Sequence, residues 1–363
     1  ADGKYTFEHS GTDAKISVGT NAVGIYAKNT DGTLNIKAPI DIAASGTGTG
    51  TDKGTTIGIY SDGNANVKFG DNSKLTIGEG AVGLYSSNPT NFDKTFAIEN
   101  GKTLTVELGK NSTFGLLNGN GNATASPVLS KFLNASATTG KIAVTQYGEG
   151  ASLFYATSKA NAVLDQDYAI TNGNAESTSV LVADNGATVE VANGKTLTTN
   201  TQVALAAVNG TTTAGSGSTA ENKGAIVSNR TNNGIGIYAK EVGSKATNDG
   251  TITMMGKEAA GMYGEDITTF ENKAGKSIEV KEEKSVGMYA KATGTNTLTA
   301  QNAGKITTNK QKSVGIYLEN ATTGPAVANL KAFNNEIEIK GGTESIGIYA
   351  PASTVSKVGK VTM

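Results

Sequence analysis

A short segment in which apolar residues alternate with small or polar ones recurs along the whole chain. In its clearest copy, SVGMYA at 285–290, the alternation places Val286, Met288 and Ala290 on one face and the residue before each of them on the other. Alternation with a period of two residues predicts a half-buried β-strand. Seven further copies are clear and four are degraded: AVGIYA (22–27), TIGIYS (56–61), AVGLYS (81–86), GIGIYA (234–239), AAGMYG (259–264), SVGIYL (313–318), SIGIYA (345–350), and the weaker TFGLLN (113–118), ASLFYA (151–156), TSVLVA (178–183) and QVALAA (202–207).

The copies return at a regular interval. The glycine of each copy, or the residue in its place, follows the previous one after 25 to 37 residues, from Gly24 to Gly347. A period of this size indicates a solenoid, a propeller or another repeat array. Twelve copies therefore predict about twelve rungs of one repeating unit.

Two further apolar pairs belong to each repeat. Most copies are followed by a turn of Asn, Asp or Gly and then by two apolar residues two positions apart, as in NGKTLTV (100–106) and AGKSIEV (274–280). Another apolar pair often precedes that turn, for example Val67 with Phe69. Three short strands and three corners per repeat predict an all-β, three-sided parallel β-helix.

A β-propeller is the main rival at this period, but its antiparallel blades need tight hairpin turns that are not evident here. In a solenoid each rung covers the inward apolar residues of its neighbour. We therefore expect residues 1–363 to form one continuous β-helix, a monomeric rod cut from a longer protein, with an incomplete first repeat at 1–21 and a further rung that begins near Val355. Loop inserts are expected near 39–53, 87–93, 118–126, 209–222 and 320–326.

Composition narrows the function classes. The net charge is −1, and Arg230 is the only Arg among 31 basic residues, so no nucleic-acid partner is expected. The absence of Cys excludes disulfides and thiolate chemistry. No apolar run is long enough to span a membrane, so we expect no membrane insertion within this segment and any signal or anchor outside it.

Candidate catalytic and metal-ligating residues are few. His9 is the only His, and no motif for an activated Ser accompanies it. Gly-Lys-Thr at 101–103 and 194–196 lacks the earlier glycine of a phosphate-binding loop. Asp165 and Asp167 lack the remaining ligand spacing of a calcium loop. We expect no catalytic residue, metal or cofactor.

An enzyme stays open as an alternative, because carboxylates are plentiful and a pair of them could flank a sugar chain in a β-helix groove. Polysaccharide lyases on this fold usually use Arg or Lys with calcium-binding acids. Here Arg230 lies in a predicted turn, and the other charged feature is KEEK at 281–284.

The Tyr of the repeat is the most distinctive binding candidate. Nine of the twelve Tyr occupy this one position, and we expect their rings to face outward and stack beside the glycines, which leave them room to lie flat. The stack would either stiffen one side of the rod or offer an aromatic strip to a sugar or protein. The candidates with the clearest repeats around them are Tyr238, Tyr263, Tyr289, Tyr317 and Tyr349.

The stretches NKAGKSIEVKEEKSVGMY (272–289) and NAGKITTNKQKSVGIY (302–317) resemble the passenger repeats of the large fusobacterial type V autotransporter adhesins, the RadD-like group. The likeness is strongest over 222–350 and degraded over 111–207. The resemblance implies a passenger on the cell surface, anchored through an outer-membrane β-barrel outside this chain, that adheres to other bacteria or to host glycans and receptors.

Together these features predict a non-enzymatic, surface-displayed adhesin segment, a rigid β-helix whose loops bind other cells, host glycans or receptors. A β-helical polysaccharide lyase or hydrolase, or a phage tailspike-like protein, is the alternative. Turnover of a polysaccharide would favour that alternative.

Overall fold

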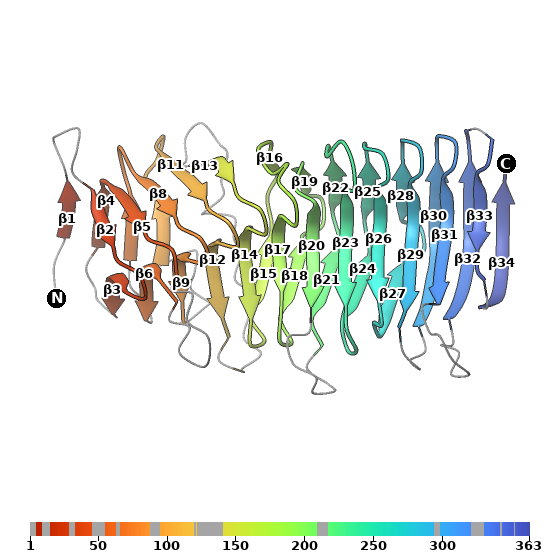
Figure 1. The fold of residues 1–363 in the computed structure, drawn as a ribbon, viewed down its shortest axis with the longest axis horizontal. Helices are drawn as coiled ribbons and strands as arrows, with labels where there is room; N and C mark the ends of the chain where they lie inside the picture. Colours follow the sequence, from red (N-terminus) through yellow and green to blue (C-terminus); the bar gives the residue numbers. More distant parts are fainter. Residues whose placement is uncertain are drawn as a thin grey trace. The chain divides into compact units, whose positions relative to one another are not determined.

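The computed structural model consists of β-strands that repeat in groups of three (Figure 1). It divides into two units, residues 1–181 and 182–363, which are described separately below. The described residues are 5–8, 15–28, 33–45, 55–62, 66–87, 95–119, 121, 141–208, 217–293, 298–320, 330–341, 343–351 and 353–363.

In the first unit, three parallel sheets follow one another around each turn. The first side holds β1 (Tyr5–Glu8), β4 (Thr33–Lys37), β7 (Asn66–Phe69) and β10 (Phe96–Ile98). The second side holds β2 (Ile16–Val18), β5 (Pro39–Ile42), β8 (Lys74–Ile77), β11 (Thr103–Leu108) and β13 (Lys141–Tyr147). The third side holds β3 (Val23–Lys28), β6 (Ile57–Asp62), β9 (Val82–Ser86), β12 (Thr113–Asn118) and β14 (Ser152–Thr157). The strands β15 (Asn161–Leu164) and β16 (Tyr168–Ile170) follow, and β17 (Ser179–Ala183) crosses the boundary.

The second unit repeats the same order of three sides. Its first side holds β18 (Thr188–Val191), β21 (Thr219–Asn222), β24 (Lys245–Asn248) and β27 (Thr269–Asn272). Its second side holds β19 (Thr196–Thr199), β22 (Ala225–Ser228), β25 (Thr251–Met254) and β28 (Ser277–Val280). The long strands β30 (Leu298–Thr308) and β32 (Leu330–Ile339) run through both of these sides, and β34 (Thr354–Thr362) pairs with β32. The third side holds β20 (Val203–Val208), β23 (Ile235–Lys240), β26 (Ala260–Glu265), β29 (Val286–Ala292), β31 (Val314–Asn320) and β33 (Ile346–Tyr349).

The predicted fold class is confirmed, because the described residues form all-β parallel coils with three sides and no propeller blade. Among the described residues, about nine turns have three separate strands. In the turns that contain β30 and β32 the first two sides are one strand, and in the turn of β13 and β14 part of the first side lies outside the described residues. Each of the twelve predicted repeat segments forms a strand of the third side. That the whole chain is one continuous rod stays a prediction.

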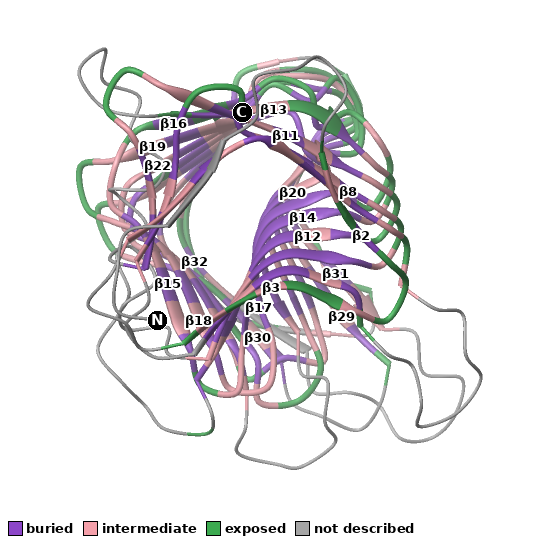
Figure 2. Cartoon of the chain, turned by 90° about the vertical axis from the view of Figure 1, so that its left-hand side faces the viewer, coloured by how far each residue is buried: buried purple, intermediate pink, exposed green. Residues whose placement is uncertain are grey.

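The core is built from columns of like residues. In the second unit β25, β28 and the second half of β30 pair in register, so that Ile252 lies beside Ile278 and Ile278 beside Ile306. All three are 1% exposed or less. Burying one such side chain contributes about 1.5–3 kcal/mol. Figure 2 shows the resulting pattern, in which buried positions follow the strands and exposed positions gather at the corners.

The repeated glycine lies on the inner side, which corrects two sequence predictions. A Cβ on Gly287 would lie 2.4 Å from Cγ2 of Ile306 and 2.6 Å from the carbonyl oxygen of Gly315. Gly287 and Met288 therefore both face the interior, and Val286 is half exposed, where strict alternation had placed Val286 with Met288. The glycine makes room for an isoleucine of the second side rather than for a tyrosine ring. A side chain at Gly287 would therefore strike the backbone of the next rung unless that rung shifted.

A column of buried asparagines, which was not predicted from the repeats, closes the corner between the first and second sides of the second unit. Asn248 Nδ2 donates to Oδ1 of Asn272 at 2.8 Å, and Asn272 Nδ2 donates to Oδ1 of Asn302 at 2.7 Å. Asn222 and Asn334 extend the same series, with bonds of 2.8 and 2.7 Å. All five side chains are 1% exposed or less. Because buried polar groups must be paired, this ladder fixes the register of every rung that it crosses.

Four predicted inserts begin or end in strands. Pro39–Ile42 is β5, which tolerates Pro39 because the proline is its first residue and needs no ladder donor. Thr219–Asn222 is β21, whose inward Ala220 and Asn222 weaken the apolar pattern. Asn118 and Asn320 likewise end β12 and β31. Most of the remaining insert residues, at 46–53, 88–93, 120, 122–126, 209–216 and 321–326, lie outside the described residues.

The asparagine ladder yields a stability prediction. The substitution Asn272→Ala removes two hydrogen bonds to neighbouring asparagines and a longer one to the Lys305 carbonyl, and it leaves buried partners unpaired. We therefore expect the free energy of unfolding to fall by about 3 kcal/mol. The exposed Asn229 is the matched control, and Asn229→Ala should change it by less than about 0.5 kcal/mol. Urea denaturation of both variants tests this, and equal small effects would show that the ladder does not stabilise the fold.

Candidate functional site

The predicted tyrosines of the second unit form an uninterrupted stack on the third side. The ring centroids of Tyr238 and Tyr263 are 5.4 Å apart, and the following neighbours are 4.9 Å apart. The interplanar angles are between 5° and 30°. The spacing follows from the in-register pairing of these strands, which places one ring above the next at each rung.

The hydroxyl ends of the stack meet a column of charged residues two positions further along each strand. Tyr263 Oη donates to Oε2 of Glu265 at 3.1 Å, and Tyr289 donates to Glu319. Each carboxylate also faces a lysine of a neighbouring rung, with Lys240 Nζ 3.3 Å from Glu265. Partial burial is the main cause that raises the pKa of the Tyr263 phenol, and the negative charge of Glu265 raises it further. The Tyr263 phenol therefore remains a neutral donor at physiological pH.

A second, shorter stack lies in the first unit. The rings of Tyr26 and Tyr60 are 5.4 Å apart, and those of Tyr60 and Tyr85 are 4.7 Å apart. In the next rung Leu116 takes the place of the tyrosine, in register with Tyr85 on one side and Tyr155 on the other. Here the neighbouring group is an amide, since Asn118 Nδ2 donates to the Tyr85 hydroxyl at 2.8 Å.

Stacking limits what the tyrosine column can bind. A sugar or a cation binds an aromatic residue on its ring face, but within each stack the faces are covered by neighbouring rings. Only ring edges and hydroxyls remain, except at the end rings such as Tyr349, which is 40% exposed. Each stacking contact is worth about 0.5–1.5 kcal/mol. The geometry favours the stiffening role of the column over an aromatic binding strip.

The other residues singled out in the sequence have structural surroundings. Arg230 is 5% exposed, and its Nε donates to the Asn232 carbonyl at 2.9 Å, so it is turned into the corner and away from any open groove. Asp165 and Asp167 belong to the turn between β15 and β16, and among the described residues no group of three or more His, Cys, Asp or Glu could hold a metal. His9 lies outside the described residues.

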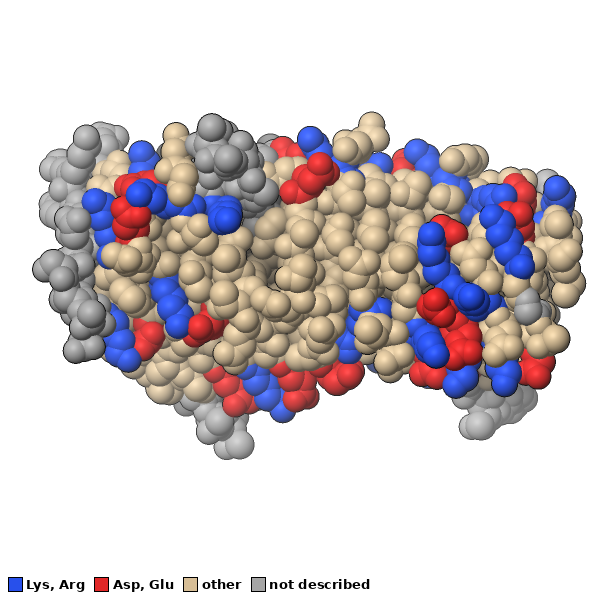
Figure 3. All heavy atoms as spheres, turned by 90° about the horizontal axis from the view of Figure 1, so that it is seen from above, with Lys and Arg blue, Asp and Glu red and all other residues tan. Residues whose placement is uncertain are grey.

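The KEEK segment forms ion pairs between rungs at the corner that joins the second and third sides. Glu283 Oε1 lies 2.8 Å from Lys257 Nζ, and Lys284 Nζ lies 3.1 Å from Glu258 Oε1. The hydrogen bond from Lys257 is the main cause that lowers the pKa of Glu283. Figure 3 shows the wider pattern, with acidic and basic side chains next to one another rather than in a patch of one sign.

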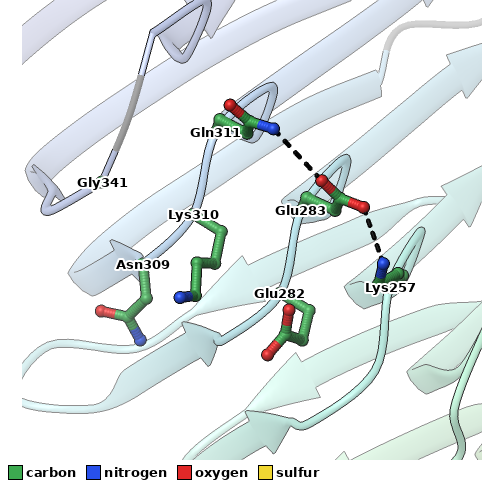
Figure 4. Close-up of a pocket in the computed structure, with 7 residues that line it drawn as sticks. All are labelled: Lys257, Glu282, Glu283, Asn309, Lys310, Gln311 and Gly341. Carbon is green, nitrogen blue, oxygen red and sulfur yellow. Dashed lines mark hydrogen bonds and ion pairs between the residues drawn. The ribbon is translucent and has the colours of Figure 1, made fainter.

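The same corner contains a polar depression of about 510 Å³ (Figure 4). The depression is not among the sites predicted from the sequence, although KEEK and the following NKQK (309–312) are a polar signal in consecutive repeats. Gln311 Nε2 donates to Oε2 of Glu283 at 3.3 Å and so extends the row that begins at Lys257. The depression is lined by Lys257, Glu282, Glu283, Asn309, Lys310, Gln311 and Gly341.

Comparison with known families gives one match, to the BigA third pectate lyase-like domain, over residues 94–350. The chain belongs to this family. The match agrees with the observed β-helix and with the expectation of a passenger-type domain, but it does not single out the fusobacterial RadD-like adhesins. Searches of curated proteins and of solved structures gave no match.

Membership of the BigA third pectate lyase-like domain family describes a fold, and a shared fold does not carry an activity with it. The described part of the chain shows no calcium-type acid cluster beside an open basic residue. None of its helices is long and apolar enough to cross a membrane.

The tyrosine stack yields a second prediction. Tyr289 has a ring on each side, whereas Tyr349 has one described ring neighbour. We expect Tyr289→Ser to lower the free energy of unfolding by about 3 kcal/mol and Tyr349→Ser to lower it by less than half as much. Thermal and urea unfolding measure both changes. If Tyr289→Ser left stability unchanged, the stack would not stiffen this side.

Proposed function

We propose that this chain is a non-enzymatic adhesin segment displayed on a cell surface, a rigid β-helix that presents binding groups to other cells, host glycans or receptors. The observation that carries the proposal is the match of residues 94–350 to the BigA third pectate lyase-like domain family, in a chain whose repeats resemble those of autotransporter passengers. Anchoring outside this chain, as in the autotransporter adhesins that the sequence resembles, would place the segment at the surface.

The arrangement of charged groups supports binding over catalysis. A polysaccharide lyase or hydrolase needs an acid and a base that can reach the same sugar. In the second unit the carboxylates of Glu265, Glu283 and Asp249 are instead paired with lysines at 3.3, 2.8 and 3.0 Å. Such pairs stabilise the stacked rungs and leave these groups poorly placed for proton transfer.

A carbohydrate-active enzyme is the second candidate, because the family is described as pectate lyase-like. The two functions differ in a measurable way. An adhesin binds its ligand at equilibrium and releases it unchanged, whereas a lyase or hydrolase shortens the polymer. Both would bind a polysaccharide, so binding alone does not separate them.

The experiment applies the purified chain to host epithelial cells, to partner bacteria and to a panel of polysaccharides that includes polygalacturonate. We expect saturable binding to at least one surface and no change in polymer length or unsaturated product over a day, with or without calcium. Binding should persist in the presence of chelator. Turnover of any polymer would contradict the proposal, as would the absence of binding to every surface.

A further inference from the structure

The depression at the second corner of the second unit has the chemistry of a carbohydrate site. We infer that it binds a neutral, hydroxyl-rich sugar residue, with Lys310 and Glu282 as the groups that contact the ligand. This inference rests on the proposed adhesive function, which it deepens by naming a ligand class and a position.

The walls of the depression are held in place before any ligand arrives. Glu283 joins Lys257 and Gln311 in one row across three rungs, at 2.8 and 3.3 Å. On the opposite side Asn309 Nδ2 donates to Oε1 of Glu279 at 2.7 Å. The turns beneath are fixed by backbone bonds between rungs, for example from Lys284 N to the Gln311 carbonyl at 3.2 Å. Preorganised walls reduce the entropy that binding would otherwise cost.

Two lining side chains remain available to a ligand. Within the described part of the chain, neither Glu282 nor Lys310 forms an ion pair or a side-chain hydrogen bond. Figure 4 shows both on the same side of the row formed by Lys257, Glu283 and Gln311. Lys310 offers donors only and Glu282 acceptors only, a combination that suits hydroxyl groups, which do both.

The amides add acceptors to this set. The nitrogens of Asn309 and Gln311 are each held by a glutamate, so their carbonyl oxygens are directed away from those partners. An array of donors and acceptors without an aromatic or aliphatic residue in the lining does not suit an apolar ligand. Pockets for drug-like molecules, in contrast, are mostly apolar.

The formal charge and the volume of the depression also favour a neutral sugar. The lining contains two lysines and two glutamates, so its formal charge is zero and it has no surplus to attract a sulfated or carboxylated polymer. The volume of about 510 Å³ falls within the range of small-molecule sites and is sufficient for one or two sugar residues. A neutral sugar is therefore the ligand class that fits best.

The test uses the complete chain and the methyl glycosides of galactose, glucose, mannose and N-acetylglucosamine, with sialyllactose and heparin fragments as acidic comparisons. Saturation-transfer NMR and titration measure binding to wild type and to Glu282→Ala and Lys310→Ala. We expect at least one neutral glycoside to bind wild type, and each substitution to raise its Kd about tenfold through the loss of a charge-assisted hydrogen bond.

Lys312→Ala is the matched control. Lys312 lies two residues from Lys310 in the same turn and pairs with Glu344 at 3.5 Å, but it does not line the depression. It should leave the Kd unchanged, and the melting temperatures of all three variants should confirm that they fold.

Three results would overturn the inference: no neutral glycoside binds wild type, both lining variants bind as tightly as wild type, or acidic glycans bind preferentially. Cell binding by the same preparations separates this inference from the proposed function. If cells are bound while the glycosides are not, the sugar site is wrong and the adhesive role stands. If neither is bound, both fail.

Discussion

The structure depends on the coverage of each coil by the next, with inward residues in register. One rung of about 29 residues cannot bury its own inward side, so its apolar residues are shielded only when the same position of the neighbouring rung lies directly beside them. The isoleucine column, the inward glycines and the asparagine ladder are three expressions of this one requirement. A shift of one residue would turn every inward side chain toward solvent.

This constraint separates the parts of the sequence that must repeat from those that are free to vary. Side chains that point inward are fixed by contacts with two neighbouring rungs. Outward positions stack as well, as the tyrosines show, and stacking uses up the ring faces that a ligand would need. Outward residues at the corner between the second and third sides of the second unit are less constrained, because a residue there needs only to allow the turn. Glu258, Lys284 and Lys312, for example, occupy the left-handed conformation with φ between 53° and 59°. Functional groups are therefore most readily accommodated at this corner.

Much of the fold could be predicted from sequence because the spacing of the repeats and the alternation within them are direct consequences of rung stacking. The features that could not be predicted are local to single positions within a rung. The inward position of Gly287 breaks the alternation because a residue without a side chain can face the core beside Met288. The asparagine ladder could not be predicted because Asn is also common in solvated turns. Only burial distinguishes a ladder asparagine from a turn asparagine. Pro39–Ile42 is a strand although it opens a predicted insert, because Pro39 as the first residue of the strand needs no ladder donor.

The candidate site was less predictable for a physical reason. The tyrosine column could be recognised because it uses one residue type at one position. The polar depression, in contrast, combines different residues from successive corners, and their proximity depends on which corner positions lie one above another. Only the register, known from the structure, brings Glu282 and Lys310 to the same depression.

Disulfide cross-linking between rungs tests this register most directly. The chain contains no cysteine, so only the introduced pair can react. Thr253 and Glu279 are partners in adjacent strands, and Thr307 lies one rung beyond Glu279. Parallel neighbours are about 4.8 Å apart and residues two rungs apart are about twice that distance, beyond the reach of a disulfide. The account predicts that a Thr253→Cys, Glu279→Cys double variant forms an intramolecular disulfide under mild oxidation and that a Thr253→Cys, Thr307→Cys variant does not. Equal cross-linking of the two pairs, or cross-linking of the second pair alone, would contradict it.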